Sequence, residues 1–292
     1  MDLLANANTD TCPVCGGAQG GTKVWDNEDF SIITCAQCLT MHLAPVPSTD
    51  AITQIYNNNY YQDDDEVHGY SDYAANEAYI KKTYRARLLK VIGRIDPDYQ
   101  CKRVHEIGSA LGYGLDVARE LLPDATITGS DISQDGIETC REKGYECYTS
   151  DVIGRSKIDG KVDLLYLFDV IEHLTDLNGF FDWTEEIVVP GGYIAFTTPD
   201  MGSILNRILG ARSPSIKIPQ HIIYFTTSSL QKLMSDKYTH QGHFIDFQHL
   251  SFGHLLSRAT HAVGLPAWSG WDRVNVPVVA PTGMKLYVFR KR

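Results

Sequence analysis

Four of the seven cysteines stand as two close pairs near the start of the chain. Cys12 and Cys15 form one C-x2-C pair, Cys35 and Cys38 form the other, and 19 residues separate the pairs. This spacing is typical of a zinc ribbon, in which each hairpin presents two thiolates to one tetrahedral ion. Because four protein ligands fill the coordination sphere, we expect a structural zinc and not a catalytic one. Its binding would help to fold a segment too small for a core of its own.

A glycine-rich turn, Glu106–Gly112, joins a predicted strand to a predicted helix. Such a turn lets a ligand approach the backbone closely. The frame that starts at Gly108 reads G-x-A-x-x-Y, so it lacks the G-x-G-x-x-G of a dinucleotide site. Glu106 stands two residues before that glycine, and its carboxylate suits a cationic ligand better than a diphosphate. The turn therefore predicts a site for a positively charged ligand.

Two more acids follow predicted strands. Asp131 ends the second strand, about 20 residues past the turn, where an acid can bind the hydroxyls of a ribose. Asp151 follows the third strand and could accept a hydrogen bond from an adenine amino group. Ligands of open α/β sheets bind at the carboxyl ends of the strands, where both acids would lie. A nucleoside with cationic groups and no phosphate, such as S-adenosylmethionine, fits these features.

Two histidines are candidates for proton transfer. His173 follows the fourth strand beside Glu172, and His221 lies in a loop beyond the fifth strand. With a reference pKa of about 6.5, histidine suits a general base near neutral pH. We expect His221 to face an acceptor pocket. For His173, catalysis and a purely structural pairing with Glu172 are equally good interpretations.

From Cys101 onward, strand-like and helix-like segments alternate. This alternation predicts an α/β fold with a mostly parallel, doubly wound, Rossmann-like sheet of seven strands and right-handed crossovers. The run Val162–Phe168 is almost continuously apolar, as expected of a strand buried on both faces. Pro190–Gly192 is predicted to be a turn. The other predicted strands are Arg103–Ile107, Ala125–Ser130, Glu146–Thr149, Tyr193–Thr198, His243–Leu250 and Met284–Arg290. The predicted helices are Tyr73–Ile95, Gly112–Leu122, Gln134–Lys143, Leu177–Val188 and His254–Val263.

Composition divides the chain into three regions. Residues 1–50 would form the zinc ribbon, and residues 51–100 an aromatic and helical segment that covers the cofactor. Residues 101–292 would form the Rossmann-like domain.

The motifs from Val104 to Thr198 resemble those of class I S-adenosylmethionine-dependent methyltransferases. The family pattern D-x-x-x-x-x-D-V-x-E-H-L is present as Asp163–Leu174, and P-G-G followed by T-P as 190–192 and 198–199. Downstream, residues 221–230 resemble the family's H-x-x-x-F-(S/T)-x-x-S-L. In the glycine-rich turn, the family pattern is E/D-x-G-x-G-x-G, and this sequence departs from it at Ala110, where many members have the middle glycine. Alanine is tolerated there if the backbone is not left-handed.

This resemblance implies the cofactor and most of the site. The residues expected to bind S-adenosylmethionine are Glu106, Gly108, Ser109, Gly112, Asp131, Ile132, Asp151, Val152, Phe168 and Asp169. Those expected to take part in catalysis are His221, His173 and Glu172. Asp169, Glu172 and His173 also resemble the E-x-x-E-H arrangement of quinone-biosynthesis O-methyltransferases, which would imply a divalent ion that orients the acceptor.

Residues 12–61 resemble the front end of a mostly bacterial subgroup that methylates sugars, nucleotide-linked sugars or secondary metabolites. The shared features are two cysteine pairs, the proline-rich stretch 44–48 and a Y-x-x-x-Y motif at Tyr56 and Tyr60. The resemblance implies O-methylation of a small-molecule acceptor. Two alternatives stay open: C- or N-methylation of a small molecule, and methylation of an RNA or protein that the zinc knuckle recruits.

The charge balance argues against a nucleic-acid partner. The net charge is -10, and Lys23 is the only basic residue between Cys12 and Cys38. The first residues, MDLLANANTD, do not resemble a signal peptide, and no stretch has the roughly 20 apolar residues of a membrane span. We therefore expect a cytoplasmic enzyme.

Overall fold

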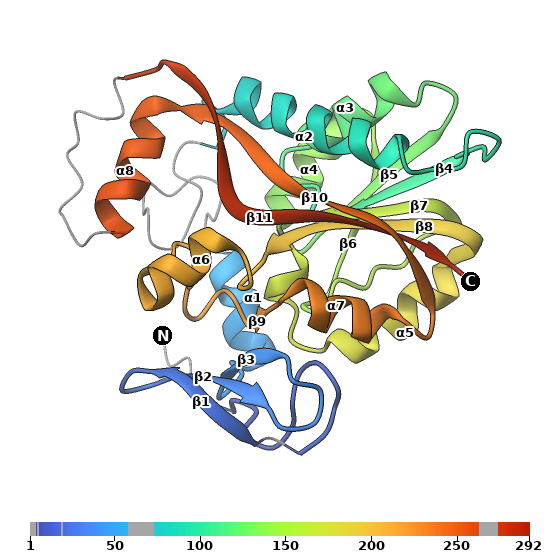
Figure 1. The fold of residues 1–292 in the computed structure, drawn as a ribbon. Helices are drawn as coiled ribbons and strands as arrows, with labels where there is room; N and C mark the ends of the chain where they lie inside the picture. The colour runs from blue at the N-terminus through green and yellow to red at the C-terminus, as the bar shows by residue number, and fades with distance from the viewer. Residues whose placement is uncertain (1–3, 5, 19, 58–72, 263–273) are drawn as a thin grey trace.

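The computed structural model describes residues 4, 6–18, 20–57, 73–262 and 274–292, and Figure 1 shows their arrangement. A seven-stranded sheet, in the order β10-β11-β8-β7-β4-β5-β6, forms its centre. β11 runs antiparallel to both of its neighbours, and the pairs from β8 to β6 are parallel. The predicted fold class is confirmed. The strands are β4 (Arg103–Ile107), β5 (Thr126–Asp131), β6 (Glu146–Thr149), β7 (Val162–Phe168), β8 (Val188–Pro199), β10 (Tyr238–Ser251) and β11 (Pro277–Lys291).

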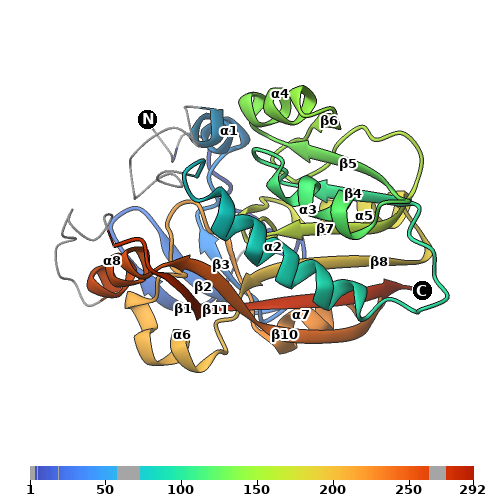
Figure 2. The ribbon, with the colours of Figure 1, turned by 90° about the horizontal axis from the view of Figure 1, so that it is seen from above.

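Helices cover both faces of this sheet, so the fold is doubly wound (Figure 2). One apolar cluster contains Leu88 of α2, Leu115 of α3 and Ile137 of α4. A second cluster contains Phe180 of α5 and Leu230 of α7. The helices are α2 (Glu77–Ile92), α3 (Tyr113–Leu121), α4 (Gln134–Glu142), α5 (Leu177–Ile187), α6 (Ile204–Leu209), α7 (Thr227–Met234) and α8 (Phe252–Ala262).

Side-chain caps fix where several helices begin. Ser133 caps α4 by accepting from the backbone N–H of Gly136, and Asp176 caps α5 by accepting from Gly179. Thr226 and Ser229 form a reciprocal capping box at α7. Each cap satisfies backbone donors that the first turn of a helix leaves unpaired.

The predicted turn at Pro190–Gly192 lies inside β8 and forms a bulge in it. The register with β7 jumps there, from Val162 opposite Val188 to Leu164 opposite Tyr193. Gly191 has φ 77°, which its missing Cβ permits, and its carbonyl accepts a hydrogen bond from Arg290. The strand therefore begins before these residues, which corrects the prediction of a free turn.

A second, antiparallel sheet contains the cysteine region (Figure 1, blue). Its order is β1-β2-β3-β9. The strand β9 (Ile223–Tyr224) is distant in the sequence from the other three and lies just after His221. Met41 and His42 of β3 pair with Tyr224 and Ile223. The backbone N–H of Leu177 also donates to the carbonyl of Pro13 at 2.8 Å. The small sheet is thus completed by the larger part of the protein. Its other strands are β1 (Gly21–Asp26), β2 (Ser31–Cys35) and β3 (Met41–Ala44).

The segment between the two sheets begins with α1 (Thr49–Asn57). Tyr60 of the Y-x-x-x-Y motif, and the rest of residues 58–72, lie outside the described residues. Within the described part of the chain, the helices are too short or too polar to cross a bilayer.

Candidate active site and cysteine cluster

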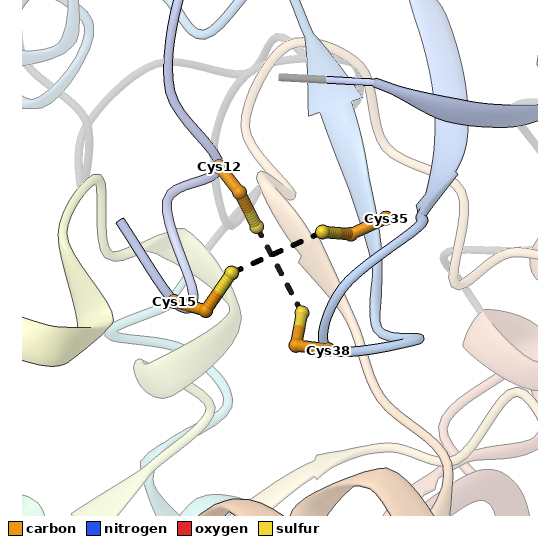
Figure 3. Close-up of side chains that lie close together, drawn as sticks. All are labelled: Cys12, Cys15, Cys35 and Cys38. Carbon is orange, nitrogen blue, oxygen red and sulfur yellow. Dashed lines mark hydrogen bonds between the residues drawn. The ribbon is translucent and has the colours of Figure 1, made fainter. Parts of the chain in front are cut away.

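The four predicted zinc ligands converge on one point (Figure 3). The Sγ atoms of Cys12 and Cys38 are 3.9 Å apart, as are those of Cys15 and Cys35. All four sulfurs lie within 4.8 Å of one another. A tetrahedral ion with Zn–S bonds of about 2.3 Å separates its sulfurs by about 3.8 Å, so the observed spacing suits zinc.

The glycine-rich turn runs from β4 into α3 and is tightly packed. Gly108 has φ 77°, and a Cβ added to it would lie 2.4 Å from the side chain of Val170. Gly112, with φ 79°, precedes the first turn of α3. Both positions therefore need glycine because of their backbone conformation, and Gly108 also because of its neighbour.

Ala110 is left-handed, with φ 46°, so the condition under which alanine would be tolerated is not met. An alanine in this conformation costs roughly 1–2 kcal/mol. Its backbone N–H donates to Oδ2 of Asp131 at 2.8 Å, which holds the turn in place. The turn thus contains strain at the position where many relatives have glycine.

Glu106 and Ser109 point beneath the turn into the domain. The carboxyl group of Glu106 is fully buried and accepts a hydrogen bond from the hydroxyl of Tyr166 at 3.1 Å. Burial raises the pKa of Glu106 well above its usual value. A Cβ added to Gly114 would lie 2.2 Å from Oε1 of Glu106, so α3 starts directly against this carboxyl group. Ser109 faces the Sγ of Cys140, and its own contact with a cofactor stays a prediction.

The two predicted ribose and adenine acids follow β5 and β6. Asp131 is buried and accepts from the backbone N–H groups of Ala110 and Ser133, both at 2.8 Å. Asp151 is exposed, and its carboxylate is paired with Arg155, with Nε–Oδ2 2.9 Å. Ile132 and Val152, the residues that follow these two acids, are half-buried.

At the end of β7, Phe168 and Asp169 meet a buried arginine that the sequence analysis did not identify. Arg87 of α2 donates from Nη1 to Oδ2 of Asp169 at 2.9 Å, and from Nε and Nη2 to Asp246 of β10 at 3.1 and 2.6 Å. Its guanidinium lies over the ring of Phe168, 5.3 Å from the centroid. Burial raises the pKa of Asp169, but Arg87 and the hydroxyl of Thr197 outweigh this effect and lower it. Asp169 therefore stays ionised, with about a fifth of its side chain exposed (21%).

A signal for Arg87 was present in the sequence. In α2 it lies on the same buried stripe as Tyr84, Leu88 and Val91. A cation on the apolar face of a helix requires a buried anion, so its position indicates a partner in the domain.

The three predicted catalytic residues lie together. Glu172 and His173 belong to a short 3-10 helix, η1 (Ile171–His173), that follows β7, and His221 precedes β9. Their ligand atoms all lie within 4.8 Å of one another, and the two imidazole rings meet edge to face with centroids 4.7 Å apart. Because Gln220 and Ser215 accept through carbonyl oxygens, Nδ1 of His173 donates to Gln220 at 2.9 Å and Nδ1 of His221 to Ser215 at 2.8 Å.

Burial sets the protonation of this Glu-His-His cluster (Glu172, His173 and His221). Burial, with a contribution from the charge of Asp169, raises the pKa of Glu172 to about 8. Burial lowers the pKa of His173 to about 4 and that of His221 well below its usual value. All three groups are therefore uncharged near neutral pH, and each neutral ring carries its lone pair on Nε2.

Comparisons with known proteins agree with this architecture. A family model described as "Methyltransferase domain" matches residues 76–237, more than half of the chain. No curated protein matches the chain. A chain from the complex between the Haloferax volcanii Trm112 methyltransferase activator and a methyltransferase is 13% identical, with a TM-score of 0.51, over 74% of this chain and 93% of that one. A structure from Bacillus halodurans C-125 named as a methyltransferase is 9% identical, with a TM-score of 0.50, over 70% of this chain and 98% of that one. The two structures share the fold, and the family model confirms the predicted methyltransferase: the chain belongs to the methyltransferase-domain family.

Proposed function

We propose that the protein transfers a methyl group from S-adenosylmethionine to a hydroxyl group of a small molecule, a sugar or a secondary metabolite. The observation that carries this proposal is the position of the Glu-His-His cluster. Glu172 and His173 lie in η1, shortly after Phe168, the last residue of β7, and Asp169, which are both predicted to contact the cofactor. In this proposal the cluster, whose neutral imidazoles can accept a proton, lies next to the methyl donor.

The acids at the carboxyl edge of the sheet fit the proposed cofactor. S-adenosylmethionine supplies a methyl group already activated by a sulfonium, so the protein needs mainly to align donor and acceptor. Asp169, ionised and partly exposed, suits a cationic group of the cofactor. Asp131, at the end of β5, is held by two backbone N–H groups, and in this proposal it binds the ribose.

We propose that the acceptor hydroxyl loses its proton at the Glu-His-His cluster. The oxygen then attacks the methyl carbon, the carbon–sulfur bond breaks, and the sulfur keeps the electron pair. If the cluster acts in this step, His221→Ala should lower kcat by roughly 100-fold or more while leaving cofactor affinity intact. Loss of both stability and cofactor binding in His173→Ala would instead mark that residue as structural.

We also propose that Cys12, Cys15, Cys35 and Cys38 hold one structural zinc. The spacing of the four sulfurs supports this assignment. In this proposal residues 1–50 form the zinc ribbon, residues 51–100 the aromatic and helical segment that covers the cofactor, and residues 101–292 the Rossmann-like catalytic domain, with β9 joined to the sheet of the ribbon. Elemental analysis of a Cys12→Ser/Cys35→Ser variant should show that this zinc is lost.

Calorimetry and a transfer assay test the central proposal. The full chain should bind S-adenosylmethionine with micromolar affinity, and Asp131→Asn should weaken this binding at least tenfold. Asp135→Asn, a change at an exposed acid in the first turn of α4, is the matched control and should leave affinity unchanged. Radioactive methyl should appear on a sugar or secondary-metabolite acceptor. A protein that binds NAD but not S-adenosylmethionine would contradict the proposal.

A further inference from the structure

We propose that Glu172, His173 and His221 bind one divalent transition-metal ion, in addition to the ion of the cysteine cluster. Two imidazoles and one carboxylate are a ligand set that several first-row metals prefer, and it leaves coordination positions open for a substrate. The ligand atoms converge to within 4.8 Å, although the residues come from two segments separated by α5, β8, α6 and a long loop. Metal binding itself does not depend on the proposed function.

The surroundings of both histidines resemble the second shell of a metal site. Each ring donates from Nδ1 to a backbone carbonyl, that of Gln220 for His173 and that of Ser215 for His221. Metal-binding histidines almost always donate their other ring N–H in this way, which fixes the tautomer and the direction of the ring. In both rings Nε2 is then the nitrogen that can bind a metal.

The third ligand provides an independent observation. Oε2 of Glu172 is buried and has no hydrogen-bond partner among the described residues. A buried acceptor without a partner costs roughly 1–3 kcal/mol, so native structures rarely keep one without a reason. The Glu172 main chain is also anchored, because its carbonyl accepts from the N–H of Ile222 at 2.8 Å. This bond ties the backbone of Glu172 to the segment that carries His221.

The structure selects this set over the one that the sequence motif implied. Asp169 is not a member of the group, since its oxygens accept from Arg87 and from Thr197. The ligand set implied by the motif contains two carboxylates and one imidazole. With His221 as the third ligand instead of Asp169, the set contains one carboxylate and two imidazoles. Such a set suits zinc, iron, cobalt or manganese better than magnesium or calcium, which prefer oxygen ligands.

The charges around the site act in both directions. The negative charge of Asp169 acts on the cluster and favours a cation. The positive charge of Lys217 acts on both histidines and opposes one. Glu172 would be ionised when an ion is bound, and its negative charge would offset one positive charge of the ion.

The catalytic consequence rests on the proposed methyl transfer. With an ion bound, the cluster would not itself accept the proton as proposed above: the ion would lower the pKa of a bound hydroxyl group, and the proton would leave to solvent. The two histidines would then act as ligands, and the ion would orient the acceptor oxygen towards the methyl group.

Metal content tests the proposal without reference to activity. The purified full chain should contain two ions when it is saturated with zinc, and it should bind two equivalents of cobalt. Cobalt bound by four thiolates has an intense sulfur charge-transfer absorption, which cobalt at the nitrogen and oxygen site lacks. The second equivalent should therefore add weak visible bands only.

Two variants remove the second site with little change in shape. In His221→Asn the amide nitrogen replaces Nδ1 as donor to Ser215, but Nε2 is lost. Glu172→Gln keeps the volume of the carboxyl group and removes its charge. Each should bind one equivalent of cobalt, with the thiolate absorption unchanged. The control is His243→Asn, at an exposed histidine whose Nδ1 lies 3.4 Å from Nε2 of His240 and which could bind metal adventitiously. It should still bind two equivalents.

Each outcome has a clear meaning. A wild-type chain that binds only the thiolate equivalent, or a second equivalent that is kept in both His221→Asn and Glu172→Gln but lost in His243→Asn, would overturn the proposal. Because Glu172→Gln tests a different ligand, it decides the question even if His221→Asn does not fold. Binding of S-adenosylmethionine, measured on the same samples, shows separately whether the proposed function holds.

Discussion

His105 should make the stability of the protein depend on pH between neutrality and pH 5. It lies in β4, is fully buried, and has its Nδ1 2.8 Å from the hydroxyl of Thr128 and its Nε2 3.0 Å from that of Ser130. Burial lowers the pKa of His105 in the folded protein to about 3. In the unfolded chain its pKa should be near the reference value of about 6.5.

The sign follows from which state binds the proton. Below about pH 6.5 the unfolded chain takes up a proton at His105 that the folded protein does not, so stability is lost as the pH falls. The contribution of His105 to the free energy of unfolding is fully present above the pKa of about 6.5 in the unfolded chain. It is lost progressively as the pH falls towards the pKa of about 3 in the folded protein. Between pH 7.5 and 5.0 the loss is about 2 kcal/mol. As long as the folded pKa is well below 5, this value depends only on the unfolded chain.

Urea unfolding at pH 7.5 and pH 5.0 measures this effect. His105→Gln keeps a side chain that can both donate and accept, so its stability should fall between the two pH values by about 2 kcal/mol less than that of the wild type. Any effect of pH on the proposed metal sites would occur in both proteins and cancel in the difference. His243→Gln, at an exposed position, is the control and should behave almost like the wild type. Equal losses in His105→Gln and the wild type would refute the reasoning.

Three further predictions concern the turn, the buried arginine and the cysteine cluster. Ala110→Gly removes roughly 1–2 kcal/mol of left-handed strain, so in thermal unfolding it should be more stable, by about that amount, than Ala118→Gly, which changes a buried alanine in the regular part of α3. Arg87→Met leaves two carboxylates without their buried cation and should lower the free energy of unfolding by about 3–5 kcal/mol. Cys12→Ser/Cys35→Ser should lower turnover more than it lowers S-adenosylmethionine affinity, because the cysteine region contacts the segment of His221 through β9. A variant that loses affinity and turnover in parallel would contradict this last expectation.

The sheet was predictable because its strands are locally distinctive. Arg103–Ile107 and Val162–Phe168 have the same bounds in the sequence analysis and in the structure. A parallel strand buried on both faces is a short apolar run, and glycine or an acid at its end marks where the chain leaves the sheet. By contrast, β9 has only two residues, and its existence depends on pairing with β3, which no local pattern reveals.

The candidate site was predictable in its members but not in its geometry. Motifs placed His173 and His221 at the same edge of the sheet, yet their contact depends on the path of the loop before β9. The left-handed conformation of Ala110 is imposed by Asp131 and the packing of the turn, and alanine itself gives no sign of it. Arg87 was visible only as a cation on an apolar stripe, and its partners lie far away in the sequence, Asp169 just after β7 and Asp246 in β10.

Ile222 links the sheet of the cysteine region to the candidate site by backbone hydrogen bonds. The N–H of Leu43, in β3, donates to the carbonyl of Ile222 at 2.8 Å, and the N–H of Ile222 donates to the carbonyl of Glu172 at 2.8 Å. Ile222 directly follows His221, so a continuous path of backbone hydrogen bonds runs from the antiparallel sheet β1-β2-β3-β9 to the Glu-His-His cluster. Backbone groups in buried strands have fixed partners, and loss of β3 would leave this path without its outer strand. The ion of the cysteine cluster would therefore be structural in its coordination and would still determine where His221 lies.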